Sequence, residues 1–433
     1  MPRLGQAPSP AVAPLRVLGR LHLVSVGLNS VIGGGIFILP ATVAALLGPL
    51  SIAAYLAAGS VVLGIGASLG SLATRFDTSG GPYLYVRRVF GSFAGFQVGW
   101  LFCLARLTAM ANLLNGAALY IGALLPALAQ PWPRAAIILM FAAVVIGLNV
   151  VGVRQTSGAA DLLAIVKVIP LLVIGIAGLF LMQPARLVPH PAPPAAFLRA
   201  VLLLCYAFTG FEILTVPAEE SKAPRRDMPF ALRATIGIVC GIYLMVQVAA
   251  TGGLPSLATE TAPLASLASL LFGGVGRASM TAVAALSMIG CSLMSLFGAT
   301  RLLYAMSQAR EIPAFLGALD PKRRTPALAA LLTGAVGAAL AIFGGFAFLA
   351  AVSSGTRLLI YFACCLASAV VAGSLRPRAL AGPLLTAAAI AVLLFGLERR
   401  EVVFGMMGVC AGTGLYLIAR PGRRGLMTQG EAT

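Results

Sequence analysis

Long apolar segments alternate with short polar ones along nearly the whole chain. Twelve apolar segments are long enough to cross a bilayer, and they begin near residues 22, 49, 93, 134, 159, 196, 229, 277, 326, 346, 382 and 401. A hydrocarbon core of roughly 30 Å is spanned by about 20 helical residues. The pattern therefore predicts an all-α integral membrane protein with twelve transmembrane helices, since a membrane β-barrel would show short strands of alternating polarity.

The polar stretches between these segments predict connectors rather than inserted domains. The longest have about 15 to 20 residues and lie near residues 75 to 92, 217 to 229 and 308 to 326. They carry the Gly, Pro and charged residues that are typical of turns and loops.

Composition and charge agree with a membrane protein. Of the 433 residues, 60% are hydrophobic and only 10% are charged, which excludes a soluble domain. The net charge of +18 could indicate nucleic-acid binding, but 21 of the 30 Lys and Arg residues fall on one side of the predicted bundle and six on the other. The positive-inside rule then predicts a protein of the cytoplasmic membrane with both termini in the cytoplasm. Its predicted partner is the lipid bilayer and not a nucleic acid.

Two of the apolar segments are interrupted at membrane depth. The first contains Gly33, Gly34 and Gly35 in a row, and the sixth contains Thr209 and Gly210. A loosened membrane helix is tolerated where its freed backbone groups face protein, a cavity or a ligand. Close packing of neighbouring helices is the alternative explanation for any single glycine. A pair of breaks five helices apart instead predicts a transporter built from inverted repeats, with its site at the midplane.

The spacing of the breaks predicts how the chain is organised. Helices 1 to 5 and 6 to 10 would form the two repeats, and helices 11 and 12 would be additions. The expected boundaries are a cytoplasmic tail over 1–20, the first repeat over 21–182, the second repeat over 183–376, helices 11 and 12 over 377–420, and a cytoplasmic tail over 421–433.

The chemistry of the two breaks is complementary. A half-helix that begins at Gly35 presents unpaired N–H groups and the positive end of its dipole, which suit a carboxylate. A half-helix that ends near Phe208 or Thr209 presents unpaired carbonyl groups, which suit an ammonium group. Together they predict a site for a zwitterion, and glycine is needed there because a Cβ would hold the ligand away from the backbone.

Four ionisable residues fall inside the predicted spans: Arg106, Lys167, Glu212 and Arg357. Such residues are candidates for function by default. A buried lysine can lose its proton whereas an arginine cannot, so Lys167 is the predicted proton carrier. The alternative is a lysine that reaches back to the interface, but Lys167 lies some eight residues, or roughly 12 Å, inside the helix.

The other three buried charges leave several roles open. Glu212 could pair with a substrate cation, pair with an arginine or bind a proton. The alternative is that Glu212 has only a structural role, as the partner of a buried cation. Arg106 and Arg357 are predicted gate or packing charges. Neither a nucleophile–base pair nor a set of metal ligands occurs at membrane depth, so the sequence predicts no enzyme, no metal site and no cofactor.

The motifs around these residues resemble the amino acid-polyamine-organocation (APC) superfamily of permeases. The matching stretches are Gly33-Gly34-Gly35-Ile36-Phe37 with Pro40, Ser79-Gly80-Gly81-Pro82-Tyr83, Leu148-Asn149 with Gly152-Val153, Phe208-Thr209-Gly210-Phe211-Glu212, Glu219-Glu220-Ser221-Lys222, Pro224-Arg225-Arg226-Asp227-Met228-Pro229 and Arg301-Leu302-Leu303-Tyr304-Ala305-Met306. The resemblance runs from about residue 18 to residue 420.

The resemblance implies the five-plus-five leucine-transporter fold and alternating access to an amino acid or a close relative. It implies that the amides of the glycine triplet hold the substrate carboxylate, and that the carbonyls of Val31, Tyr206 and Thr209 hold its amino group. Lys167 matches the lysine that proton-coupled members carry where sodium-coupled relatives bind an ion. Glu212 matches an acid of the arginine/agmatine antiporters.

Three departures from the family pattern bear on the substrate. Gly34 replaces a serine of many relatives, and Tyr206 and Ser295 stand where the arginine/agmatine antiporters carry tryptophans. The smaller aromatic surface argues against arginine, because guanidinium groups favour aromatic faces. A neutral amino acid is the leading expectation, with a proton as the coupling ion. An exchanger or exporter of amino acids or polyamines and a non-transporting sensor are the alternatives.

Overall fold

The computed structural model describes residues 19–76, 81–152, 157–215, 223–373 and 377–419. Every regular element within these ranges is helical. The α-helices are α1 (Arg20–Val31), α2 (Gly34–Leu47), α3 (Ser51–Ala73), α4 (Gly81–Phe90), α5 (Ser92–Leu124), α6 (Pro131–Val151), α7 (Ser157–Phe180), α8 (Pro194–Ala207), α9 (Pro224–Gly253), α10 (Pro263–Gln308), α11 (Ala327–Phe343), α12 (Phe346–Gly373), α13 (Ala381–Leu394) and α14 (Arg399–Ala419). Short 3-10 helices join them: η1 (Gly48–Leu50), η2 (Pro126–Ala129), η3 (Pro184–Leu187), η4 (Phe211–Thr215), η6 (Leu257–Thr259), η7 (Ala314–Gly317) and η8 (Pro377–Leu380).

The helices make this chain a multi-pass membrane protein. Among the described residues, eight helical stretches are long and apolar enough to cross a bilayer. Three further apolar helices, α8, α11 and α13, are shorter. Each of the twelve predicted segments begins within a helix or at its first turn, and the count of twelve spans stays a prediction.

Two elements differ from the sequence expectation. The predicted connector near residues 75 to 92 contains the helix α4, whose low apolar content hid it from a search for membrane spans. The eighth segment was expected to begin near residue 277, but α10 begins at Pro263 and bends at Gly273, where φ is +64°. Pro suits the first turn of a helix and Gly suits positive φ, so an extra helical arm precedes the expected span.

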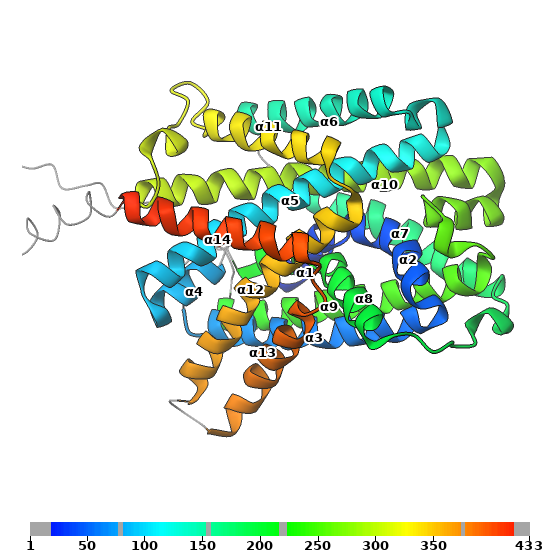
Figure 1. The fold of residues 1–433 in the computed structure, drawn as a ribbon, viewed down its shortest axis with the longest axis horizontal. Coiled ribbons are helices and arrows are strands. Elements are labelled where there is room, and N and C mark those ends of the chain that lie inside the picture. The colour runs from blue at the N-terminus through cyan, green and yellow to red at the C-terminus, as the bar shows by residue number, and fades with distance from the viewer. Residues whose placement is uncertain (1–18, 77–80, 153–156, 216–222, 374–376, 420–433) are drawn as a thin grey trace, which may run out of the picture.

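The arrangement of helices encloses the two breaks (Figure 1). The long helices α5 and α10 pack side by side, α6 and α11 lie at one edge of the molecule, and α13 lies at the opposite edge. Helix α1 packs mainly against α9 and α7, α2 packs against α8 and α10, and α8 also packs against α3 and α12. On the outside, α6 and α14 expose large apolar side chains, including Leu139, Met140, Met406 and Met407. Such a surface suits hydrocarbon as the surrounding solvent.

Both helix interruptions lie where the glycines predicted them. Helix α1 ends at Val31 and α2 begins at Gly34, with Ile32 in an extended conformation between them. Helix α8 ends at Ala207, and the chain turns through Gly210 before η4. Gly210 has a φ of +116°, a conformation that residues with a Cβ rarely adopt.

Candidate functional site

The two breaks contact each other directly. A Cβ on Gly35 would lie 2.4 Å from the Cα of Ala207, and a Cβ on Gly210 would lie 2.5 Å from the carbonyl oxygen of Ser30. Atoms at such distances overlap, so glycine is required at both positions by the approach of the opposite backbone. Close helix packing, the alternative explanation for these glycines, therefore does apply to Gly35 and Gly210. The helices that they allow to approach each other are the two broken ones.

A cavity of about 50 Å³ lies where the breaks meet. Eleven of the thirteen predicted site residues line it: Val31, Gly33, Gly34, Gly35, Arg106, Tyr206, Thr209, Gly210, Glu212, Ser295 and Arg357. The walls thus come from both broken helices and from α5, α10 and α12. A water molecule needs roughly 10–15 Å³ of such volume, so the cavity in this conformation has room for only a few waters.

The remaining two predicted residues lie away from the cavity wall. The ring of Phe208 packs against Tyr243, with 5.2 Å between the ring centroids, and is fully buried. Lys167 lies on α7, behind the end of α1. Phe208 therefore packs the turn against α9, and Lys167 contacts the end of α1 rather than the cavity wall.

The ammonium group of Lys167 holds the end of α1. Its Nζ atom donates to the carbonyl oxygens of Asn29 at 2.8 Å and Ile32 at 3.1 Å, and lies 3.3 Å from the Sγ atom of Cys291. These contacts join α7 to α1 and α10.

Glu212 is held by three partners at once. Its Oε1 atom lies 3.3 Å from Nη1 of Arg357, and its Oε2 atom accepts hydrogen bonds from the backbone N–H of Gly210 at 2.8 Å and the hydroxyl of Tyr361 at 2.9 Å. Glu212 and Arg357 are both almost completely buried. The carboxylate thereby fixes the second break and joins it to α12.

Arg106 enters the cavity from α5. Its guanidinium carbon lies 4.6 Å from the ring centroid of Phe102, one turn earlier on the same helix. A Cβ on Gly298 would lie 2.4 Å from Nη1 of Arg106, so the missing side chain at 298 on α10 makes room for the guanidinium.

The backbone N–H and carbonyl groups at the two breaks differ in whether they already form hydrogen bonds within the protein. The first N–H groups of α2 have no acceptor within the helix, as at every helix start. The carbonyl oxygen of Tyr206 accepts hydrogen bonds from the amide of Thr209 at 3.1 Å and from its hydroxyl at 2.8 Å. The carbonyl oxygen of Val31 accepts a weak hydrogen bond of 3.4 Å from the hydroxyl of Tyr243. The amide end is therefore the more available half of the site.

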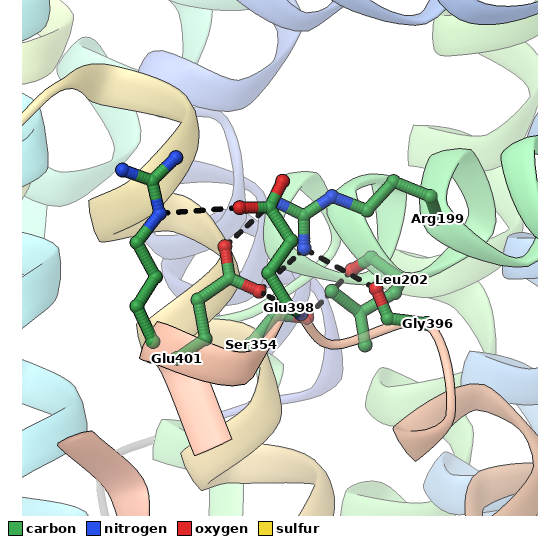
Figure 2. Close-up of polar contacts among 7 residues, drawn as sticks. Arg199, Leu202, Ser354, Gly396, Glu398 and Glu401 are labelled. Carbon is green, nitrogen blue, oxygen red and sulfur yellow. Dashed lines mark hydrogen bonds and ion pairs between the residues drawn. The ribbon is translucent and has the colours of Figure 1, made fainter. Parts of the chain in front are cut away.

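A polar network anchors the start of α8 (Figure 2). Nη1 and Nη2 of Arg199 donate to the two carboxylate oxygens of Glu401 at 2.5 and 2.6 Å, and Nη2 lies 3.3 Å from Glu398. Further along α8, the carbonyl oxygen of Leu202 accepts a hydrogen bond of 2.7 Å from Ser354 on α12. The first half of the sixth segment is thus attached to α12 and to the start of α14.

Several residues of the site were not predicted from the sequence. Tyr361, which binds Glu212, lies four residues after Arg357 and so on the same face of α12. Cys291 lines the cavity one turn before Ser295 on α10, and Leu113 lines it seven residues after Arg106 on α5. Helical spacing from the predicted residues is the signal that could have found all three.

Comparison with known proteins identifies relatives over almost the whole chain. A model of the amino acid permease family matches residues 18–409. An uncharacterized transporter of Mycobacterium tuberculosis is 32% identical over 425 residues, covering 94% of this chain and 91% of the relative. An aromatic amino acid transport protein of Corynebacterium glutamicum is 29% identical, covering 72% of this chain and 70% of the relative. A branched-chain amino acid permease of Bacillus subtilis is 26% identical, covering 75% and 74%.

Proposed function

This chain belongs to the amino acid permease family of the APC superfamily, and from that premise we propose that it is a secondary transporter that moves an amino acid across the cytoplasmic membrane by alternating access. Relatives named as transporters of aromatic and branched-chain amino acids support an amino acid as the cargo. The family and the transporter names of its relatives also indicate a transporter rather than an enzyme.

The observation that carries the proposal is the meeting of two half-helix ends at one cavity. The N-terminus of α2 and the C-terminus of α8 both border it. N–H groups at the first end suit a carboxylate, and carbonyl groups at the second suit an ammonium group. An α-amino acid carries both groups on one carbon, and this pairing supports the glycine triplet as the carboxylate site.

Alternating access requires that the cavity open to each side of the membrane in turn. In the proposed architecture, helices 1 to 5 and 6 to 10 of twelve spans are inverted repeats, and both termini are cytoplasmic. The two broken helices would move relative to α5 and α10, as the halves of such transporters do around a fixed site.

The proposed coupling ion is a proton carried by Lys167. The three contacts of its Nζ atom support this role, because loss of a proton removes one donor and weakens the attachment of α1 to α7 and α10. Protonation would then favour the conformation described here, and deprotonation would release the first half-helix.

A neutral amino acid remains the expectation from the sequence. Tyr206 and Ser295 both line the cavity and offer a smaller aromatic surface than two tryptophans would. Exchange or export of an amino acid or a polyamine uses the same site and differs in the gradients that drive it. A sensor would bind the ligand without moving it.

Uptake of labelled amino acids by proteoliposomes tests the proposal. The purified protein is expected to accumulate at least one amino acid when the outside is acidic, and to respond weakly to a sodium gradient. Accumulation driven by sodium and indifferent to pH would contradict proton coupling. Stimulation by internal substrate would indicate exchange, and saturable binding without flux would indicate a sensor.

A further inference from the structure

The wall of the cavity carries more positive than negative charge. Among the described residues that line it, the side chains charged at neutral pH are Arg106, Glu212 and Arg357. Arginine keeps its proton even inside a protein. Two guanidinium groups therefore face one carboxylate.

The single carboxylate forms its ion pair with Arg357, and it interacts with Arg106 only electrostatically, at longer range. Oε1 of Glu212 lies 3.3 Å from Nη1 of Arg357, and its Oε2 atom accepts two hydrogen bonds, from Gly210 and Tyr361. Glu212 thus balances the charge of Arg357 and holds the second break in shape.

Arg106 contributes the charge that remains. It is 8% exposed, and it makes no hydrogen bond or ion pair with any residue in the described part of the chain. Its five N–H donors reach the cavity, since none of its nitrogen atoms is among the fully buried polar atoms that lack a partner, and removing such a group from bulk water is costly. The ring of Phe102 offsets only part of that cost, because a cation over an aromatic face gains less than one paired with a carboxylate.

The position of Arg106 separates it from the amide end of the site. Leu113 lies beside the glycine triplet, where a Cβ on Gly34 would be 3.2 Å from its Cδ2 atom. Arg106 lies seven residues earlier on the same face of α5, which is about 10 Å along the helix axis. A ligand whose α-carboxylate is bound at the glycines therefore has a second cationic group available at another part of the same cavity.

We propose that the transported substrate is an acidic amino acid, whose side-chain carboxylate pairs with Arg106 while its α-carboxylate and ammonium groups occupy the two helix breaks. The inference rests on the proposed transport function and names the substrate class of the same site. An acidic substrate replaces the neutral amino acid expected from the sequence, because a neutral side chain brings no carboxylate to Arg106 and a basic one adds another cation. A second carboxylate matches the guanidinium in both charge and bidentate geometry.

Glutamate and glutamine provide a direct test, because they have nearly the same shape and differ in charge. Uptake of each labelled amino acid is measured in proteoliposomes that contain the full-length protein. The uptake efficiency of wild-type protein is expected to be at least tenfold higher for glutamate than for glutamine. In Arg106→Gln this ratio is expected to fall at least tenfold.

Arg301→Gln is the matched control. In wild-type protein the guanidinium carbon of Arg301 lies 4.7 Å from the ring centroid of Phe297, which is the same one-turn stacking that Arg106 makes on Phe102. Arg301 does not line the cavity. The glutamate-to-glutamine ratio of this variant is expected to equal that of wild-type protein. Aspartate against asparagine provides a second pair should Arg106→Gln fail to fold.

The outcomes separate this inference from the function on which it rests. Equal uptake of glutamate and glutamine, or a preference for glutamine, would overturn the acidic substrate and leave amino acid transport standing. An unchanged ratio in folded Arg106→Gln would overturn the role of Arg106. Failure of folded wild-type protein to take up any of glutamate, glutamine, leucine and arginine would instead contradict the proposed transport function.

Discussion

Gly35 and Ala207 bring the two broken helices into backbone contact, since a Cβ on Gly35 would lie 2.4 Å from the Cα of Ala207. These residues lie at the start of α2 and the end of α8 and are separated by most of five predicted spans. The contact places the positive end of one half-helix next to the negative end of the other.

Replacement of Gly35 by alanine is expected to destabilise this contact. The added methyl group meets backbone atoms that cannot rotate away, and overpacking of this kind costs about 1–3 kcal/mol. Thermal unfolding in detergent should occur at a lower temperature, with loss of transport. Gly237→Ala on α9 is the control, because beyond the neighbouring backbone of its own helix no described atom lies within 4 Å of a Cβ at that position. Equal stability of the two variants would contradict the close contact.

Removal of the Glu212 charge is expected to leave Arg357 buried and unpaired. Breaking a buried ion pair from one side costs about 3–5 kcal/mol. Glu212→Gln should therefore unfold at a markedly lower temperature than wild-type protein, and Glu212→Gln combined with Arg357→Gln should recover part of the loss. Simple addition of the two single effects would show that the groups do not interact.

Lys167→Ala is expected to remove the response of transport to a pH gradient, because the proposed proton carrier is lost. Ser287→Ala is the control, since the Ser287 hydroxyl donates to the same Ile32 carbonyl at 2.9 Å but does not titrate. Uptake by the serine variant should still follow the gradient. Full pH-driven uptake by folded Lys167→Ala would exclude this lysine as the carrier.

Glu401→Gln is expected to loosen the start of α8. The carboxylate is fully buried and receives two short hydrogen bonds from Arg199, and hydrogen bonds to charged groups contribute about 1.5–3 kcal/mol. Hydrogen exchange of α8 amides should become faster. Arg400→Gln serves for comparison, because the Arg400 side chain is 73% exposed and its ion pair with Glu398 should contribute little. Similar exchange in both variants would argue against Arg199 as the anchor.

The sequence predicted the membrane class and both helix breaks because each has a local cause. Apolar length identifies spans, and the glycine triplet and Gly210 mark positions where only glycine fits. Two other features depended on contacts that composition does not reveal. The amphipathic helix α4 is too polar for a span, and the arm of α10 before Gly273 extends beyond the predicted segment.

For the charged residues, too, the sequence predicted the positions but not the contacts. Their depth in the membrane marked Arg106, Glu212 and Arg357 as functional candidates. Which arginine pairs with Glu212 depends on the packing of α12 against the turn after α8, and no spacing in the sequence encodes it. Because Glu212 pairs with Arg357, Arg106 has no direct ion pair within the described residues, and this bears on the substrate.

The direct contact between the two helix breaks has a consequence for how measured affinities should be interpreted. If only an opened conformation admits substrate, the apparent dissociation constant equals the intrinsic one divided by the fraction of molecules that are open. A tenfold gain in that fraction would then appear as a tenfold gain in affinity. A variant that weakens the contact between the two breaks without unfolding the protein could therefore bind substrate more tightly while making no new contact with it.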